Sequence, residues 1–230
     1  MVQSTSTSDV GFGEYGNDEP YVLITADTHA GGSHAQYREY LEADDRAAFD
    51  EWRGGYRNPS QEHYGSKKLR NWDFEIRSRD QDSQGVVGEV IFPNTVPPFY
   101  RKSIVTAQPP RPEDYPRALA GIRAHNRWLA DFCAEDPERR AGIGLILPND
   151  LEEAVKDIEF IAKAGLRGGL LLPCHFSGSA TQSFFSFMPV ILTVTTSGRP
   201  SGGTNAFPRV FSSWPSATIC FKTAFSATRL

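Results

Sequence analysis

Four short apolar runs, separated by longer segments with helical spacing, constrain the fold of this chain more than any other feature. Apolar runs of this length are typical of strands that are buried on both faces. The expected strands are residues 21–26, 86–92, 143–147 and 166–172. The expected helices are residues 35–52, 68–84, 117–134 and 151–164. Strands that alternate with helices in this way predict a parallel sheet with helical crossovers.

Residues at the element boundaries support this assignment. Asn149 or Asp150 can cap the start of the last helix, and Gly165 can end it. Gly85 can end the second helix in the same way. The Pro-rich residues 97–116 cannot form a regular helix and are expected to be a loop. The third helix has an apolar stripe that we expect in the core: Leu119, Ile122, Trp128, Leu129 and Phe132.

The fourth expected strand ends by residue 173, which leaves too little chain for a full eight-stranded barrel of about 250 residues. Four strands in this order make half a barrel or a small open sheet. The predicted fold class is α/β, a truncated TIM-type (β/α)8 barrel of about four units. This half barrel is expected at residues 20–175. Residues 1–19 are rich in Ser, Thr and Gly and are expected to be a flexible leader. Residues 176–230 are expected to be an irregular tail that does not belong to the barrel.

The tail differs from the rest of the chain in composition. All 28 acidic residues lie at or before Glu159, whereas residues 176–230 hold 18 Ser and Thr, four basic residues and no acid. A shift of reading frame would explain this change, because codons can be chosen for residues 187–201 that spell an acidic segment and a Trp-Ala-Ala helix in another frame. A divergent C-terminal element is the alternative. The Phe, Ser and Thr content is also compatible with a β-rich or aggregation-prone segment.

Charge and cysteine content exclude several protein classes. A net charge of −4 argues against nucleic-acid binding, which usually requires a basic face. No run approaches the roughly 18 apolar residues that cross a bilayer, and the N-terminus lacks the pattern of a signal peptide. Cys133, Cys174 and Cys220 are too few and too widely spaced for a disulfide framework or a zinc ribbon. We therefore expect a cytoplasmic protein without nucleic-acid or membrane partners.

Asp27-Thr28-His29, at the end of the first expected strand, is the sharpest chemical signal. Residues two apart in a strand face the same side. A carboxylate and an imidazole at this spacing can therefore bind one divalent ion at the C-terminal mouth of a barrel. The plain alternative is a turn aspartate followed by a loop histidine. We predict Asp27 and His29 as metal ligands.

Other candidates carry weaker signals. His175 follows the fourth expected strand and is either a third ligand or a loop residue. Its neighbour Cys174 has no activating base nearby in the sequence. Asn94 follows the second strand and either contacts substrate or caps a turn.

The remaining histidines are expected to be structural or solvent-exposed. His34 and His63 lie in polar segments, so we expect both to be exposed. His125 is expected on the outer face of the third helix.

The segment from Tyr21 to Gly31, followed by Tyr37-Arg38-Glu39-Tyr40-Leu41, resembles the opening of the amidohydrolase-related family, which includes decarboxylases of the aminocarboxymuconate-semialdehyde type. Further similar segments follow in family order: Arg79-Asp80, Gly85, Glu89-Val90-Ile91-Phe92-Pro93, Asn126-Arg127-Trp128-Leu129-Ala130-Asp131-Phe132-Cys133, Asp136-Pro137-Glu138-Arg139, Glu153-Ala154-Val155 and Gly165-Leu166-Arg167-Gly168-Gly169. The resemblance covers about residues 21–173.

The resemblance implies a divalent metal, usually zinc, whose first two ligands correspond to Asp27 and His29. The family completes its site with later histidines and an aspartate after the eighth strand. The chain has no histidine, aspartate or glutamate beyond His175. Catalytic zinc normally needs three protein ligands, so two alone are expected to bind metal weakly.

The resemblance predicts a metal-dependent hydrolase or non-oxidative decarboxylase that acts on a small carboxylate or amide-like substrate and is impaired by truncation. The alternative is an inactive barrel fragment or an interaction module, because a half barrel exposes two sheet edges unless it pairs with another copy as a homo-oligomer. A nucleotide-binding domain is a third class. It lacks support because no Gly-rich fingerprint follows the first strand.

Overall fold

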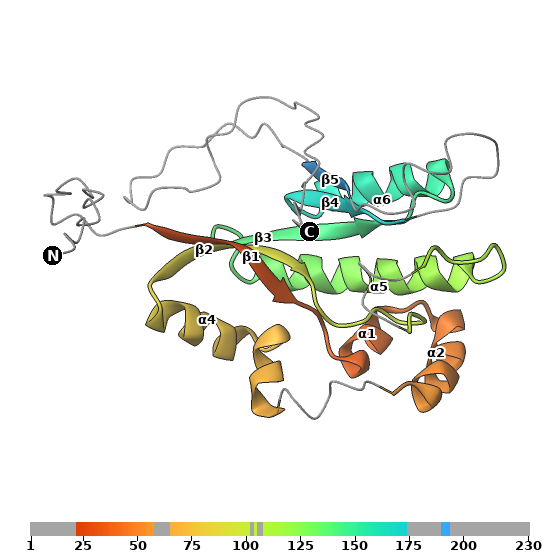
Figure 1. Ribbon diagram of the computed structural model, residues 1–230, viewed down its shortest axis with the longest axis horizontal. Coiled ribbons are helices and arrows are strands. Elements are labelled where there is room, and N and C mark those ends of the chain that lie inside the picture. Colours follow the sequence, from red (N-terminus) through yellow and green to blue (C-terminus); the bar gives the residue numbers. More distant parts are fainter. Residues whose placement is uncertain (1–21, 58–64, 102–103, 105–107, 174–189, 194–230) are drawn as a thin grey trace, which may run out of the picture.

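Five strands form one sheet in chain order in the computed structural model of the protein, which describes residues 22–57, 65–101, 104, 108–173 and 190–193 (Figure 1). The strands are β1 (Leu23–Ala30), β2 (Val86–Pro93), β3 (Arg140–Ile146), β4 (Gly168–Leu171) and β5 (Val190–Thr193). The first four are parallel, and β5 is antiparallel to β4. The predicted α/β fold with four parallel strands is thus confirmed, and it is consistent with part of a TIM-type barrel.

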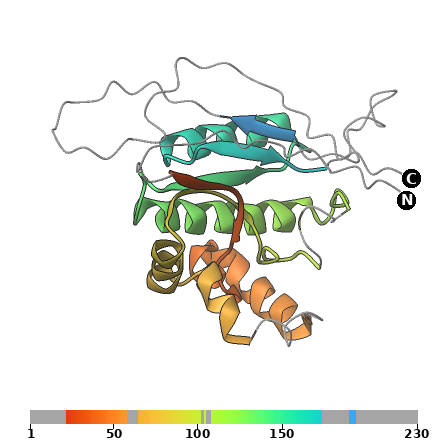
Figure 2. The same cartoon turned by 60° about the vertical axis from the view of Figure 1, so that its left-hand side comes forward.

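The helices lie between successive parallel strands. They are α1 (His34–Tyr40), α2 (Ala43–Gly55), the 3-10 helix η1 (Gly65–Asn71), α4 (Phe74–Ser83), α5 (Tyr115–Ala134) and α6 (Leu151–Lys163). Helix α5 packs against β3 and carries α1 on its far side, whereas α6 packs against β3 and β4 (Figure 2). None of the described helices is long and apolar enough to cross a membrane.

Two of the expected helices are each divided in two, for local reasons. Helix 35–52 is interrupted at Leu41 and Glu42, whose backbones are extended, because the Leu41 side chain turns into the core. Helix 68–84 is interrupted at Asp73, whose carboxylate accepts a hydrogen bond from the backbone N–H of Ile76 and caps α4. An aspartate inside a helical pattern thus starts a new helix.

The bounds of β2 and α6 agree with the sequence prediction to within one residue, whereas β1 ends four residues later and β3 begins three residues earlier than predicted. Asp150 caps α6 by accepting hydrogen bonds from two backbone N–H groups of its first turn. Gly85 and Gly165 follow α4 and α6 with φ of 69° and 77°, values that glycine adopts without strain. Helix α5 begins two residues earlier than predicted, because Pro116 fits the first turn.

The prediction of an irregular tail is wrong for Val190–Thr193, which forms β5. Three of these four residues are β-branched, which favours a strand. The rest of the tail and the leader at residues 1–19 lie outside the described residues. The frame shift, the truncation and the domain boundaries therefore stay predictions.

Helix α5 supplies most of the core beneath the sheet. All five residues of its predicted apolar stripe are buried, as expected. Trp128 and Phe132 stack with ring centroids 4.9 Å apart and pack with Tyr37 and Ile91 in one cluster.

An asparagine side chain completes the hydrogen bonding of β3. The pairing of β2 with β3 ends at Ile91 and Gly142, whereas β3 continues to Ile146. Beyond that point Asn126 of α5 takes the place of a neighbouring strand. Its Oδ1 accepts from the Leu145 N–H at 2.7 Å, and its Nδ2 donates to the Leu145 carbonyl at 2.8 Å.

His125 is fully buried, so its expected place on the outer face of the helix is wrong. Its Nδ1 lies 2.8 Å from the Tyr37 hydroxyl, which joins α1 to α5. Burial lowers the pKa of His125 to about 3. The predicted exposure of His125 was wrong because a histidine that hydrogen-bonds a tyrosine can take the place of an apolar residue in the core.

This burial predicts a pH dependence of stability. The folded protein holds His125 neutral while the unfolded chain protonates near pH 6.5, so its contribution is complete above pH 6.5 and is lost as the pH falls toward 3. The loss approaches about 1.4 kcal/mol per pH unit. The free energy of unfolding, measured by urea denaturation at several pH values, should therefore change less steeply with pH in His125→Gln than in the wild type. Equal slopes would contradict the prediction.

Candidate metal centre

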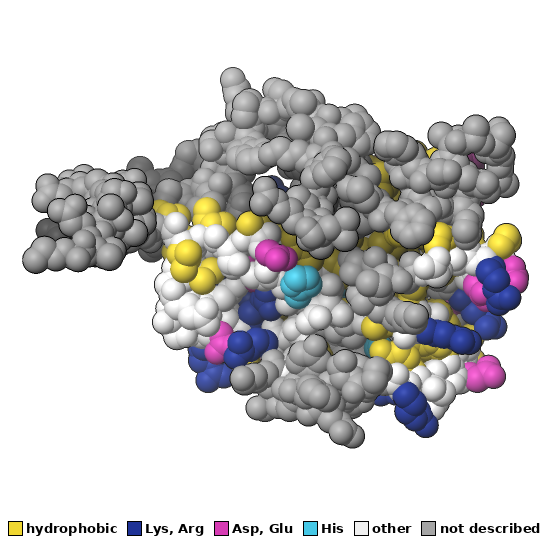
Figure 3. Space-filling view, viewed as in Figure 1, with side chains coloured by type: hydrophobic (Ala, Val, Ile, Leu, Met, Phe, Trp, Pro, Cys, Tyr) yellow, Lys and Arg dark blue, Asp and Glu magenta, His cyan; other side chains and the backbone are white. Residues whose placement is uncertain are grey.

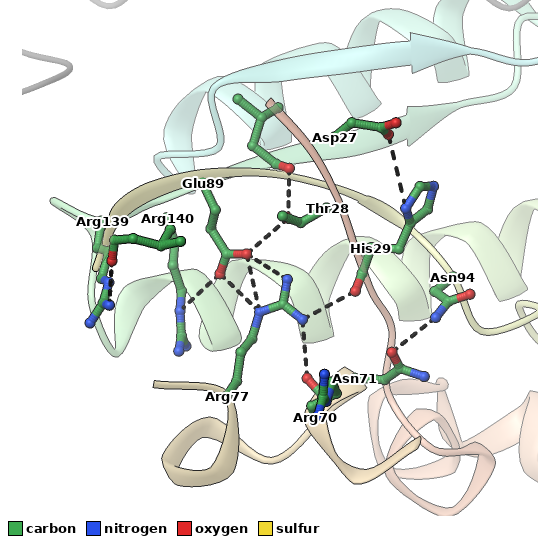
Figure 4. Close-up of polar contacts among 12 residues, drawn as sticks. Asp27, Thr28, His29, Arg70, Asn71, Arg77, Glu89, Asn94, Arg139 and Arg140 are labelled. Atoms are coloured by element: carbon green, nitrogen blue, oxygen red, sulfur yellow. Dashed lines mark hydrogen bonds and ion pairs between the residues drawn. The ribbon is translucent and has the colours of Figure 1, made fainter. Parts of the chain in front are cut away.

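Asp27 and His29 lie inside β1, which runs to Ala30, rather than after it. Their side chains point to the same side of the strand, as their spacing predicts (Figure 4). The Asp27 Oδ1 and the His29 Nδ1 are 4.0 Å apart. The side chains are 85% and 50% exposed, respectively, so both are open to a ligand from solvent.

A bulge in β1 includes Asp27, the first residue of the pair. Thr25 is opposite Glu89 and Thr28 is opposite Ile91, so three steps along β1 match two steps along β2. The extra residue falls at Ala26 and Asp27, and bulges of this kind redirect side chains. The position of Asp27 therefore depends on an irregularity that the sequence did not reveal.

Thr28 points to the opposite side of β1, toward a buried carboxylate (Figure 4). Its Oγ1 lies 2.8 Å from the Glu89 Oε2 and 2.8 Å from the Val90 carbonyl. Arg77 of α4 donates from Nε to the Glu89 Oε1 at 2.9 Å and from Nη1 to the His29 carbonyl at 3.1 Å. A network of buried polar groups thus underlies the Asp27–His29 pair.

Glu89 remains ionised in this network. Burial raises the pKa of its carboxyl, but the hydrogen bonds and the positive charge of Arg77, together with the Thr28 hydroxyl, outweigh burial and lower the pKa below its usual value. The Arg140 Nε adds a second positive charge 3.6 Å from Glu89 Oε1. None of the residues in this network was predicted from the sequence to have a role.

Asn94 and Asn71 meet beside the pair, at the C-terminal ends of β2 and η1. The Asn94 Nδ2 donates to the Asn71 Oδ1 at 2.9 Å, and the Asn71 carbonyl accepts from the Gly31 N–H at 3.1 Å. The His29 ring lies 6.1 Å from the Phe92 ring, centroid to centroid. Asn94 is exposed, so either role suggested by its sequence position stays open.

The donor atoms of Asp27 and His29 suit a divalent ion but form an incomplete ligand set. Two ligands about 2.1 Å from a tetrahedral metal are about 3.4 Å apart, so a small side-chain rotation from 4.0 Å would suffice. Among the described residues, no group of three or more His, Cys, Asp or Glu side chains could hold a metal. His175, Cys174 and His63 lie outside these residues.

His34 does not belong to the site and is only partly exposed, which corrects the expectation of a solvent-exposed side chain. Its Nε2 is 3.0 Å from the Val96 carbonyl, and its ring packs edge-on against Trp52 and Tyr56. Burial lowers its pKa. Trp52 of α2 and Tyr56, directly after that helix, explain this burial.

A groove of about 390 Å³ lies between α5 and α6. Its charges are largely matched: Arg123 donates to Asp157 at 2.8 Å and to Glu153 at 2.7 Å. None of its lining residues was a candidate from the sequence, so we do not assign the chemistry to it.

No protein-family model matches the chain, and no curated protein matches it. Several solved structures are similar to it. A 2,6-dihydroxybenzoate decarboxylase complexed with 2,6-dihydroxybenzoate is 17% identical, with a TM-score of 0.42 over 70% of this chain and 42% of that chain. A 5-carboxyvanillate decarboxylase from Novosphingobium aromaticivorans with manganese and 4-hydroxy-3-methoxy-5-nitrobenzoic acid is 22% identical, with a TM-score of 0.45 over 72% of this chain and 45% of that chain.

A dihydroxybenzoic acid decarboxylase from a Polaromonas species, with bound manganese and the inhibitor 2-nitroresorcinol, is 19% identical, with a TM-score of 0.40 over 67% of this chain and 38% of that chain. The chain spans less than half the length of each matched structure.

Proposed function

We propose that this chain is part of a metal-dependent enzyme, a hydrolase or non-oxidative decarboxylase that acts on a small carboxylate or amide-like substrate. One observation carries the proposal: Asp27 and His29 present a carboxylate and an imidazole on the same side of β1, with donor atoms 4.0 Å apart. This pair matches the first two metal ligands of the family that the sequence resembles.

In this proposal Asp27 and His29 hold a divalent ion, which supplies Lewis acidity when bound. Zinc is usual in the family that the sequence resembles, and manganese occurs in two of the matched structures. Phe92 and Asn94 stand at the same edge of the sheet, where an aromatic ring and an amide can bind and orient a small polar substrate. The remaining ligands would come from outside the described residues, where His175 is the candidate from the sequence.

Metal titration tests the pair directly. Wild-type protein should bind Mn²⁺ or Zn²⁺ in calorimetric titrations, and Asp27→Asn or His29→Ala should each weaken binding by about tenfold or more. Both side chains are largely exposed, so the substitutions should leave the fold intact. Asp44→Asn, on the exposed first turn of α2, is the matched control and should bind like the wild type. Unchanged affinity in both site variants would overturn the proposal.

Product analysis separates the two reactions. We would incubate the metal-loaded protein with small aromatic carboxylates, including 2,6-dihydroxybenzoate and 5-carboxyvanillate, and with small amides. Release of CO₂ that requires Asp27 identifies a decarboxylase, whereas amide cleavage that requires Asp27 identifies a hydrolase.

An inactive interaction module is the second candidate, and the surface of β1 favours it. Val22, Leu23, Ile24 and Val87 are between 40% and 57% exposed, and apolar side chains gather where β1 begins (Figure 3). Exposed apolar patches often mark contact surfaces. A protein that forms a complex through this patch and binds no metal would favour this candidate. The same result would favour the inactive, truncated barrel that the sequence predicts.

A further inference from the structure

We propose that Thr28, Glu89 and Arg77 form a positioning network that holds the Asp27–His29 pair from the opposite face of β1. The inference rests on the proposed function, because it concerns the geometry of the same metal ligands. None of the three side chains shares the face on which Asp27 and His29 project (Figure 4). They act through the backbone of the ligand pair.

The contacts of the network end on the ligand pair itself. Thr28 is the residue between the two ligands, and its hydroxyl is 2.8 Å from the Glu89 carboxylate. Arg77 donates from Nη1 to the carbonyl of His29 and to that of Arg70, both at 3.1 Å. The strand is therefore held at the side chain of residue 28 and at the carbonyl of residue 29, and these two anchors set the directions in which the neighbouring side chains leave the strand.

The bulge explains why such anchors are needed. The register of β1 against β2 shifts between Thr25 and Thr28, so Asp27 lies where the regular ladder is interrupted. A bulged residue lacks the paired hydrogen bonds that fix an ordinary strand. The hydrogen bonds of Thr28 and Arg77 fix the position of the backbone directly after the bulge.

The composition of the network also favours a positioning role over simple packing. Glu89 is fully buried and Arg77 nearly so. Apolar residues of similar volume often stabilise a fold as well as a buried ion pair does, because they avoid the cost of desolvating the charges. Apolar side chains could not, however, form directional hydrogen bonds to the His29 carbonyl and the Thr28 hydroxyl.

Two mild substitutions test the inference in the full chain. Thr28→Val removes only the hydroxyl, and valine suits a strand. Arg77→Lys keeps the positive charge near Glu89 but loses the planar guanidinium that reaches Glu89 and the His29 carbonyl together. The matched controls are Thr25→Val, the same change on the same face of β1, and Arg123→Lys, an ion-paired arginine on α5.

We expect Mn²⁺ affinity to fall by about tenfold or more in Thr28→Val and Arg77→Lys, the range for groups that orient metal ligands. Amide hydrogen exchange across residues 27–31, measured without metal, should accelerate in both variants while α6 exchanges as in the wild type. The control variants Thr25→Val and Arg123→Lys should change neither the Mn²⁺ affinity nor the amide exchange of residues 27–31. Mn²⁺ binding at wild-type affinity in both test variants would overturn the inference alone, whereas a wild-type chain that binds no Mn²⁺ would overturn the proposed function together with it.

Discussion

Replacing Glu89 with leucine should lower the free energy of unfolding by about 3–5 kcal/mol, the usual cost of removing one partner from a buried ion pair. Glu89 is the counter-charge for Arg77 and Arg140, both of which are buried. Without it, two guanidinium groups would share an apolar interior with no acidic partner. Since small proteins are stable by about 5–15 kcal/mol, this single change removes a large part of the total.

Urea denaturation followed by circular dichroism measures the effect. Glu89→Gln, which keeps the shape and an accepting oxygen, should cost less than Glu89→Leu. Glu42→Leu is the control, because Glu42 pairs with Arg127 at the surface and such pairs contribute about 0–1 kcal/mol. If Glu89→Leu were no more destabilising than Glu42→Leu, the network could not hold a buried, ionised glutamate.

Asn126→Leu is the second large change and should cost about 2–6 kcal/mol. The asparagine amide satisfies both the N–H and the carbonyl of Leu145, where β3 has passed the end of its pairing with β2. Leucine would leave two buried backbone groups without partners, at about 1–3 kcal/mol each. Asn126→Asp should be damaging as well, because it places a carboxylate oxygen against the Leu145 carbonyl.

Hydrogen exchange resolves this effect to one residue. The Leu145 amide should exchange much faster in Asn126→Leu than in the wild type, and the midpoint of urea unfolding should fall. Asn94→Leu provides the control, since Asn94 is exposed and its amide bonds only the Asn71 side chain, so the change should matter little. A Leu145 amide that stays protected in Asn126→Leu would show that the asparagine is dispensable.

The sequence predicted the parallel sheet because each of its first four strands contains a short apolar run. It predicted too few helices, because a helical pattern does not show where one helix stops and the next begins. Leu41 breaks the first pattern by entering the core, and Asp73 breaks the second by capping α4. The first break depends on a tertiary contact, and the second depends on a cap that competes with helix propagation.

The metal pair could be predicted because its two residues are neighbours in one strand. Its supporting network could not, since Arg77 and Thr28 reach Glu89 from 12 and 61 residues away. One signal was present: Glu89 is a charged residue inside an apolar run, and a charge there requires a partner. The sequence does not say which of the many arginines provides it.

The direction of β5 restricts how the sheet can be extended. A parallel barrel grows when its fifth strand joins β4 in the same direction. Here β5 runs the opposite way and takes the hydrogen-bonding groups of Gly168–Leu171. While β5 is in place, no parallel strand can pair directly with β4, so any strand that extends the sheet on that side has to pair with the outer edge of β5 instead.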